Sequence, residues 1–432
     1  MHYPWWYVPF LTAPMLIAVI AVIHVFVSHY AVGGGILLAL ENQFAVKTGD
    51  KPYRDYLHRH AKFFVLLTVA FGAITGVGIW WTIALTSPLA TEKLIRTFVF
   101  GWAIEWVFFI IEIVAAFVMY YHWSRLPEKT HVIITWIYAL AAWISLVLIT
   151  GITAFMLDSR GLIADWSETG NFWHAFLNVQ FLPQTVARTG GAVLLAALYI
   201  LMHAAWIFRN TNDPLLEKTV RRMSKPLIAG IVLVLAGAAW SFSLLPDAKL
   251  LSVERTVFLT ILFALFAGLS VLITLMVFFG PVLNPKSINF GFAVSIFILS
   301  LTALSVAEFG REAVRKPWIV DKVVLGNQIY ASEAAERQES GFLKDSYFIK
   351  LPNDKAQLGG MVFMYHCNNC HAPDRGLSPA GLLVYGEDKA KIKDKIRSLN
   401  VPVASMPPWC GTEAELDALA DYLLSVNSKR GK

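Results

Sequence analysis

The stretch "LTAPMLIAVIAVIHVFVSHYAVGGGILLAL", residues 11–40, decides the fold class of the chain. It contains no Asp, Glu, Lys or Arg, and it exceeds the roughly 20 apolar residues that an α-helix needs to cross a bilayer. A helix of this length must tilt or project from the membrane. The first charged residue is Glu41, so the start of the chain lacks the basic region of a cleaved signal peptide.

The same apolar pattern recurs up to about residue 310. Of the 432 residues, 56% are hydrophobic and 15 are tryptophans. Repeated apolar runs of this length indicate membrane helices. We therefore predict an all-α fold whose main part is a polytopic bundle of about eight transmembrane helices. Their predicted cores are residues 11–44, 62–87, 94–122, 131–157, 186–208, 226–245, 255–280 and 288–309.

The basic residues predict the orientation of this bundle. Lys and Arg are frequent in the loops after the first, third, fifth and seventh spans, and cytoplasmic loops hold the excess of such residues. The other loops hold fewer: Lys93, Arg96, Arg160, Arg188, Lys249 and Arg255. We expect both termini outside, in a multi-pass protein of a bacterial cytoplasmic (inner) membrane with a periplasmic C-terminal domain. The net charge of +6 follows mostly from this topology, so we expect lipid and no nucleic acid as a partner.

A second motif, "MYHCNNCHAPDRG", occupies residues 364–376. Cys367, Cys370 and His371 form the C-x-x-C-H pattern of covalent heme c attachment, in which the cysteines bond the porphyrin and the histidine is an axial ligand. A zinc site is the alternative, but it needs a second pair of ligands. The only other cysteine is Cys410.

The distal ligand of this heme is predicted to be Met406, in the Pro-rich stretch "VASMPPWC". Met361 and Met364 are poorer candidates because they precede the motif on the same predicted helix. Thr412 and Glu415 form a capping box before a final amphipathic helix. "LGGMVFMYHCNNCH", the Met-Pro loop and "LADYLLSV" resemble a class I cytochrome c domain over roughly the last 75 residues.

These patterns divide the chain into three parts. We expect a transmembrane domain at residues 1–320, a linker at residues 321–355 and a small all-α periplasmic cytochrome c domain at residues 356–432. Within the last part, "KAKIKDKIR" (389–397) is a basic stretch. It is either a solvated helix face or a docking surface for an acidic redox partner.

Three ionisable residues stand out inside predicted spans, where charge is costly and therefore indicates function. His24 and Glu105 are each about 20 Å along their helices from the outer side. Glu112 follows Glu105 by two helical turns, so both carboxylates share one face. A lone intramembrane histidine can also be a packing residue. The weaker candidates, most of them at helix ends or in cytoplasmic loops, are His29, His58, His60, His122, His131 and His203.

Four stretches resemble, in the same order, subunit I of the cytochrome bd oxidases. They are "HVFVSHYAVGGGILLALENQFAVKTGD" (24–50), "AIEWVFFIIEIVAAF" (103–117), "NFWHAFLNVQFLPQTVAR" (171–188) and "AEFGREAVRKPW" (307–318). The resemblance implies that His24 is an axial ligand of an active-site heme and that Glu105 is the carboxylate beside it. It implies a role in proton uptake for Glu112, although the Glu105–Glu112 spacing is one residue shorter than in the family.

The last of these stretches departs from the family pattern. Gly310 and Arg311 match the start of the family's G-R-Q-P-W element, and Arg311 is expected to contact a heme. Additional residues then precede Pro317 and Trp318. The carboxylate that ligates a second active-site heme is therefore open between Glu308, Glu312 and Asp321, with Glu312 preferred.

Two further departures concern electron input. Gln184 replaces the histidine that ligates the family's low-spin heme b, and His174 is a possible substitute ligand. The family's long quinol-binding loop shrinks to "LLPDAKLLSVER" (244–255). We therefore expect the heme c to replace both as the place where electrons enter.

The expected function is that of a heme-containing terminal oxidase subunit. Electrons from a periplasmic cytochrome c or another soluble donor would pass through heme c to one or two hemes b and/or d, where O2 is reduced to water. The family resemblance implies a second, homologous membrane subunit as partner. The alternatives are a quinol dehydrogenase that exports electrons through heme c, and a non-catalytic heme-bearing subunit paired with a catalytic homologue.

Overall fold

The computed structural model describes residues 12–211, 213–344, 351–376, 378–401 and 405–428. Within them, eight helices are long and apolar enough to cross a membrane. The prediction of an all-α bundle with about eight transmembrane helices is confirmed. The spans are Met15–Thr48, Lys51–Thr86, Val99–Tyr121, Glu128–Phe155, Phe181–Ile207, Pro214–Ser243, Val257–Val282 and Phe290–Arg315.

The elements up to the end of the eighth span are helical. They are α1 (Ala13–Thr48), α2 (Lys51–Val65), the π-helical η1 (Leu66–Phe71), α3 (Gly72–Thr86), α4 (Pro88–Thr97), α5 (Val99–Tyr121), α6 (Glu128–Phe155), α7 (Trp166–Thr169), α8 (Phe172–Phe176), α9 (Phe181–Ile207), α10 (Pro214–Ser243), α11 (Asp247–Arg255), α12 (Val257–Val277), the π-helical η2 (Phe278–Val282), the 3-10 turn η3 (Pro285–Ser287) and α13 (Phe290–Arg315).

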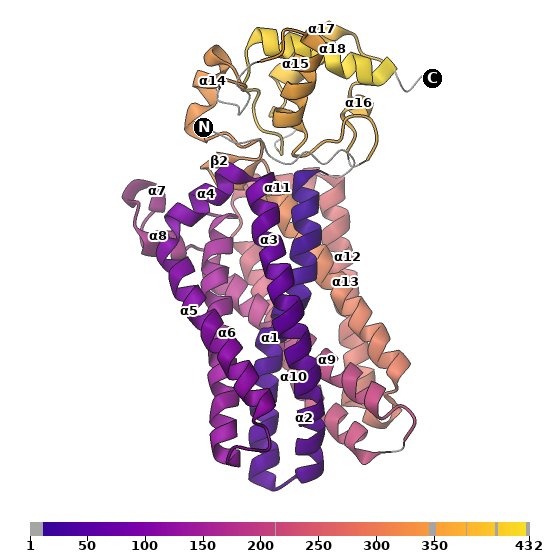
Figure 1. Cartoon of the computed structure of the whole chain (residues 1–432). Helices are drawn as coiled ribbons and strands as arrows, with labels where there is room; N and C mark the ends of the chain where they lie inside the picture. The colour runs from indigo at the N-terminus through magenta and orange to yellow at the C-terminus, as the bar shows by residue number, and fades with distance from the viewer. Residues whose placement is uncertain (1–11, 212, 345–350, 377, 402–404, 429–432) are drawn as a thin grey trace.

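A short antiparallel pair of strands follows, and then a smaller helical domain. These elements are β1 (Trp318–Val320), β2 (Val324–Leu325), η4 (Ala331–Glu333), α14 (Ala334–Ser340), α15 (Lys355–Val362), the π-helical η5 (Phe363–Cys367), α16 (Ala380–Leu383), α17 (Lys389–Arg397) and α18 (Glu413–Ser428). This C-terminal domain lies over the end of the bundle that carries α11 (Figure 1).

Two spans begin earlier than hydropathy predicts. Asp50 accepts a hydrogen bond from the Tyr53 N–H, which caps α2 at Lys51. Asp213 accepts one from the Leu215 N–H and caps α10 at Pro214. Capping residues and a proline in the first turn favour helix starts, but the first turns are polar. A hydropathy profile therefore misses helix that extends beyond the hydrocarbon.

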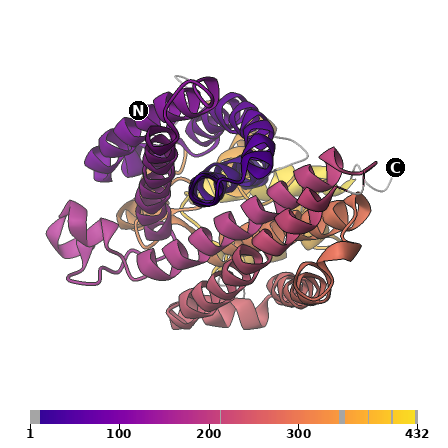
Figure 2. The same ribbon diagram turned by 90° about the horizontal axis from the view of Figure 1, so that it is seen from below.

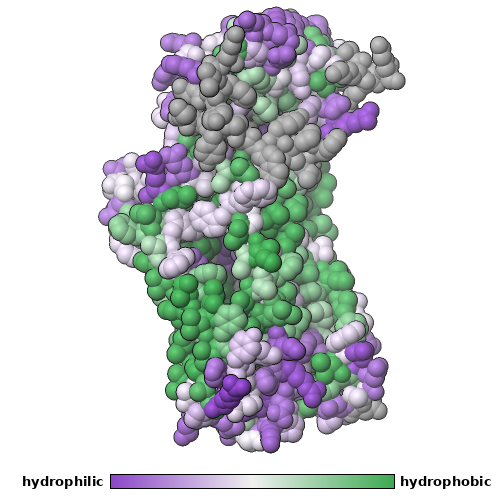
Figure 3. All heavy atoms as spheres, in the orientation of Figure 1, coloured by the Kyte–Doolittle hydropathy of each residue, from purple (hydrophilic) through white to green (hydrophobic). Residues whose placement is uncertain are grey.

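The surface of the bundle matches a bilayer. On the face that Figure 3 shows, a broad apolar band covers the middle of the bundle, and polar residues gather at the end opposite the C-terminal domain and on that domain itself. Viewed along the bundle, the early helices gather on one side and the later helices on the other (Figure 2). Helix α9 packs against α1, α6, α10 and α13, and thereby joins the two groups.

Glycines allow α9 to reach this central position. A Cβ atom on Gly33 of α1 would lie 1.9 Å from the carbonyl oxygen of Ala192, and one on Gly190 would lie 2.6 Å from the backbone nitrogen of Val234 in α10. Backbones in contact at such small residues are typical of membrane helix interfaces. In α9, 61% of the most apolar window is buried, against at most 33% in the other spans.

We expect Gly190→Val to destabilise the bundle by about 1–3 kcal/mol or more, because the added side chain overlaps backbone atoms of α10. Thermal unfolding of the detergent-purified protein, followed by circular dichroism, measures the loss.

The matched control is Gly268→Val in α12, where an added Cβ meets no atom within 4 Å. Equal melting temperatures for the two variants would show that the contact between α9 and α10 does not limit stability.

The residues expected to form a linker, 321–355, make extensive contacts where the structure describes them. Val320 and Val324 pack with Leu89, Phe98 and Phe155 on the bundle. Phe342 and Leu343 pack with the C-terminal domain, and the backbone N–H groups of both donate to the Glu415 carboxylate at 2.8 and 2.9 Å. Where the structure describes it, the expected linker therefore packs against the bundle at its start and against the C-terminal domain further on.

Candidate functional site

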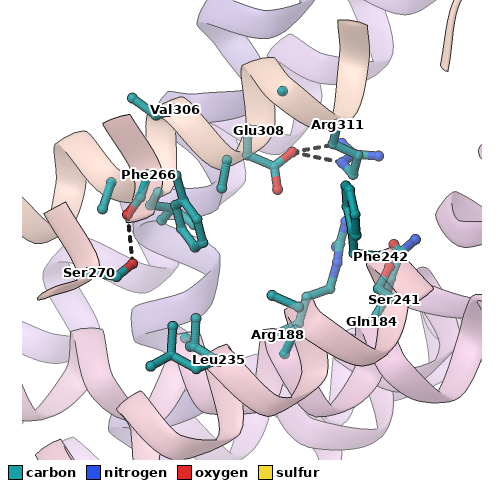
Figure 4. A pocket seen from close by; sticks show the side chains of 18 of the residues that line it. Gln184, Arg188, Leu235, Ser241, Phe242, Phe266, Ser270, Val306, Glu308 and Arg311 are labelled. Atoms are coloured by element: carbon teal, nitrogen blue, oxygen red, sulfur yellow. Dashed lines mark hydrogen bonds and ion pairs between the residues drawn. The ribbon is translucent and has the colours of Figure 1, made fainter. Parts of the chain in front are cut away.

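A cavity of about 280 Å³ lies between α1, α9, α10, α12 and α13. Most of its wall is apolar, with Leu, Ile, Val and Phe side chains mainly from α9, α10, α12 and α13, whereas α1 contributes His29. In Figure 4, the side chains of Arg188, Glu308 and Arg311 point toward the same open space. The titratable or amide-bearing side chains that line it are His29, Gln184, Arg188, Glu308 and Arg311.

The polar part of the cavity carries an ion pair. Glu308 accepts two hydrogen bonds from Arg311, at 3.2 Å from Nε and 2.7 Å from a terminal nitrogen. Arg188 faces the same space, and its charge is close enough to interact with that of Glu308. Two cations and one anion give this part of the wall a net positive charge. In an apolar cavity, such a wall is complementary to an anionic ligand.

The three carboxylates considered as ligands of a second active-site heme have different surroundings. Glu308 lines the cavity, whereas Glu312 forms an ion pair with Arg315 and does not line it. Asp321 lies 2.8 Å from the Lys249 ammonium. Glu312 lies one helical turn beyond Glu308 towards the end of α13, so Glu308 is the candidate carboxylate that lines the cavity, and Glu312 as a heme ligand stays a prediction.

Lys249 and Asp321 form a buried ion pair that joins α11 to the segment after α13. The Lys249 ammonium also donates to the carbonyl oxygen of Leu157. Burial lowers the pKa of Lys249, and the Asp321 charge opposes that shift. The shortened loop at 244–255 is therefore held against the bundle by its own lysine.

We expect Asp321→Ala to cost about 3–5 kcal/mol, because it leaves a buried ammonium without its partner. The double variant Asp321→Ala, Lys249→Met should recover most of that loss. Chemical unfolding and total heme content are measured together. Heme loss that persists in the stable double variant would make Asp321 a heme ligand after all.

His24 is placed to bind a metal through its Nε2 atom. Its Nδ1 atom lies 3.0 Å from the Thr75 hydroxyl oxygen. That hydroxyl donates its proton to the Phe71 carbonyl at 2.8 Å, so the His24 Nδ1–H is the donor to Thr75. Among the described residues no hydrogen bond reaches Nε2, so its lone pair is available, which is the usual arrangement of a metal-ligating histidine. Gly76 lies beside the ring, with a built Cβ 3.4 Å from Cε1.

The two carboxylates of the third span lie on α5. Ser145 of α6 donates to Glu105 at 3.0 Å, and the Glu112 charge is close enough to interact with that of Glu105. Among the described residues, no hydrogen bond or ion pair joins His24 to Glu105. The structure thus places them on different neighbours, His24 against α3 and Glu105 against α6.

We expect His24→Ala to abolish the carbon-monoxide-induced absorbance change of a heme in the bundle, without changing the spectrum of a heme held at the C-x-x-C-H motif. Thr75→Val should weaken that change without removing it, because it removes only the partner that orients the ring. Carbon monoxide difference spectra of the purified protein provide the measurement. An unchanged spectrum in His24→Ala would identify His24 as a packing residue.

In the C-terminal domain, His371 is oriented in the same way as His24. Its Nδ1 atom lies 2.9 Å from the Ser378 carbonyl oxygen and must donate to it, so Nε2 is free. Helix α15 crosses α18 closely, since a Cβ on Gly359 would lie 2.1 Å from the Ala418 carbonyl. Trp409 stacks on His366 with ring centroids 4.8 Å apart. This contact brings the loop of Met406 beside the segment that carries Cys367.

The attachment motif contacts the end of the eighth span. The Lys316 ammonium, one residue beyond α13, lies 3.0 Å from the Cys370 sulfur. Glu308 is eight residues earlier, or about 12 Å along a helix. The C-x-x-C-H motif therefore lies directly above the helix that lines the cavity.

Three expectations from the sequence change. Arg188, counted in an outer loop, lies inside α9 and lines the cavity. His29, placed among the weaker histidines, is 5% exposed and lines it too. The sequence feature that could have identified Arg188 as a functional candidate is its charge within an apolar span. His174 is hydrogen-bonded to Thr169 and does not line the cavity, so it is badly placed to substitute for the lost ligand.

The basic stretch 389–397 forms α17 and is largely neutralised. Lys389 and Lys393 pair with Asp417, Lys395 pairs with Glu387, and Arg397 pairs with Glu413 at 2.7 Å. Hydrogen bonds from Lys355, Lys389 and Lys393 lower the pKa of Asp417. The pairing favours the solvated-face interpretation of α17 over a docking surface.

Comparison with known proteins agrees with this geometry. The fold and site define a multi-pass membrane protein with buried histidines and carboxylates suited to heme. Residues 13–245 match the family described as "Cytochrome bd terminal oxidase subunit I", and the chain belongs to that family. It is therefore a subunit of a heme-containing oxidoreductase, a family that works in the membrane with a second subunit and O2.

The fold is shared with a solved structure, "The structure of bd oxidase from Geobacillus thermodenitrificans". The TM-score is 0.62 at 16% sequence identity, over 71% of this chain and 87% of that chain. No curated protein matched the sequence.

Proposed function

We propose that the chain is a terminal oxidase subunit that accepts electrons from a soluble donor through a covalently bound heme c and reduces O2 to water. Family membership supports the oxidase part. The observation that carries the electron input is the 3.0 Å contact between Lys316 and the Cys370 sulfur. It supports a direct route from the attachment motif to α13.

The C-terminal domain is proposed to be a periplasmic cytochrome c, with a membrane domain before it and both termini outside. Cys367 and Cys370 would bond the porphyrin, and His371 would ligate iron through the Nε2 atom that its Ser378 contact leaves free. Met406 would be the distal ligand. The close crossing of α15 and α18 at Gly359 supports the assignment of this domain as a cytochrome c.

Inside the bundle, His24 is proposed to hold an active-site heme through Nε2, with Glu105 beside it and Glu112 passing protons from the cytoplasmic side. Heme groups b and/or d, when bound, would supply the iron that carries electrons and binds O2. A second heme would occupy the cavity, where Glu308 is the carboxylate that faces it. Arg311 holds Glu308 in place.

Quinol is not proposed as the donor. The loop at 244–255 contains the short helix α11, whose Lys249 is committed to Asp321. The proposed partners are a soluble donor such as a periplasmic cytochrome c and a second, homologous membrane subunit. An electron exporter would take electrons from a different donor. A non-catalytic subunit would show no O2 turnover. The following experiment distinguishes both from the proposed oxidase.

We expect reduced cytochrome c, and not reduced quinol, to support oxygen uptake by the purified complex. In the Cys367→Ala, Cys370→Ala variant, uptake with cytochrome c should fall at least tenfold, because electrons lose their covalent heme on the outer side. The oxygen electrode measures both rates in the same preparation.

The matched control is Cys410→Ala. This cysteine is buried against Pro408 and lies outside the motif. Full quinol-driven uptake in the variant without heme c would make the C-terminal domain an exit for electrons. Absence of uptake with either donor, in wild type and variant alike, would favour the non-catalytic subunit.

A further inference from the structure

Gln184 occupies an unusual position in the cavity wall. Its side chain is only 7% exposed, yet both amide atoms, Oε1 and Nε2, lack a hydrogen-bond partner among the described residues. A buried polar group without a partner costs about 1–3 kcal/mol. The amide lines the cavity, so a ligand in that space can provide the missing partner.

Arg188 lies one helical turn after Gln184, on the same face of α9. No hydrogen bond or ion pair links its guanidinium to any described residue, although Glu308 attracts it from across the cavity. The carboxylate of Glu308 is already held by Arg311. Arg188 is therefore the cation of the wall that lacks a bonded anion, beside an amide that lacks a donor or acceptor.

His29 provides the third element of the site. Its ring lies against α9, with Cδ2 3.4 Å from the position of a Cβ on Gly191. It is the histidine among the lining residues. Gln184, Arg188 and Gly191 follow one another at four- and three-residue spacings, which place them along one face of α9 over about 10 Å.

We propose that Gln184 and Arg188 bind the carboxylate groups of a heme in this cavity and that His29 is a ligand of its iron. The proposal rests on the proposed function only in taking the cavity ligand to be a heme. In this proposal Gln184 does not ligate iron. Its side-chain amide donates a hydrogen bond to a carboxylate at the edge of the porphyrin.

The chemistry of the wall favours heme over other ligands. A porphyrin presents a large apolar face to the Leu, Val, Ile and Phe side chains that form most of the wall, and two carboxylates at one edge. An amide and a guanidinium bind a carboxylate well. A quinol has no carboxylate for Arg188, and an anionic lipid has no metal ion for the imidazole to ligate.

The test uses the full-length purified protein and counts non-covalent heme against covalent heme c, by extraction followed by the pyridine hemochrome assay. We expect His29→Gly to lose one equivalent of non-covalent heme, or to retain it with an altered spectrum. Gln184→Leu and Arg188→Leu should each weaken heme retention by roughly tenfold or more. His203→Gly and Arg96→Leu are the controls, because neither residue lines the cavity.

Imidazole rescue separates ligation from packing. We expect imidazole added to His29→Gly to restore the heme count and the resonance Raman iron–nitrogen band, because a small ligand can occupy the space of the missing ring. A merely structural histidine would not give a ligand-dependent iron signal. The rescue also covers the case in which a less conservative variant fails to fold.

Full heme retention and an unchanged spectrum in His29→Gly would overturn the assignment of His29. Phospholipid in place of heme in the wild-type cavity, detected by native mass spectrometry, would overturn the site. Either result leaves the heme c at Cys367 and Cys370 and the carbon monoxide signal of His24 intact. Failure of this inference is therefore distinguishable from failure of the proposed function.

Discussion

The arrangement of the bundle depends on the backbone contact of α9 with α1 and α10. At Gly33 the contact brings α1 against Ala192, and at Gly190 and Gly230 it brings α9 against α10. Lipid tails are as apolar as leucine, so hydrophobicity alone does not hold membrane helices together. Close packing of small residues holds these helices together, and it determines which face of α9 lines the cavity. Gln184, Arg188 and Gly191 lie on that face because α10 and α1 occupy the others.

Charge inside hydrocarbon is the second constraint. The cavity wall holds Arg188, Arg311 and Glu308, and one ion pair neutralises only two of them. An unbalanced cation in a low-dielectric space is costly, which makes an anionic ligand part of the stability of the site. His24 and His371 share one feature of ring orientation, although they lie in different domains. In each, a hydrogen bond at Nδ1 commits one ring nitrogen and leaves the other for metal.

Helix α13 connects the two halves of the molecule. It carries Glu308 and Arg311 on the cavity, and Lys316 directly after its end contacts Cys370. The segment that follows packs first on the bundle through Val320 and Val324 and then on the C-terminal domain through Phe342 and Leu343. The position of the attachment motif above the cavity is thus fixed by packing on both sides of the connection.

The sequence by itself determined the eight apolar spans, the C-x-x-C-H motif and the family, because each rests on local residue order. It also singled out His24, whose intramembrane position is visible in hydropathy. Only the tertiary structure shows that Glu308 lines the cavity while Glu312 pairs with Arg315 and Asp321 with Lys249, because these neighbours come from the packing of the chain and not from residue order. That His29, Arg188 and Gln184 line the same cavity is likewise visible only in the fold. Their chemistry depends on sharing one cavity, and a cavity is formed by helices that are distant in sequence.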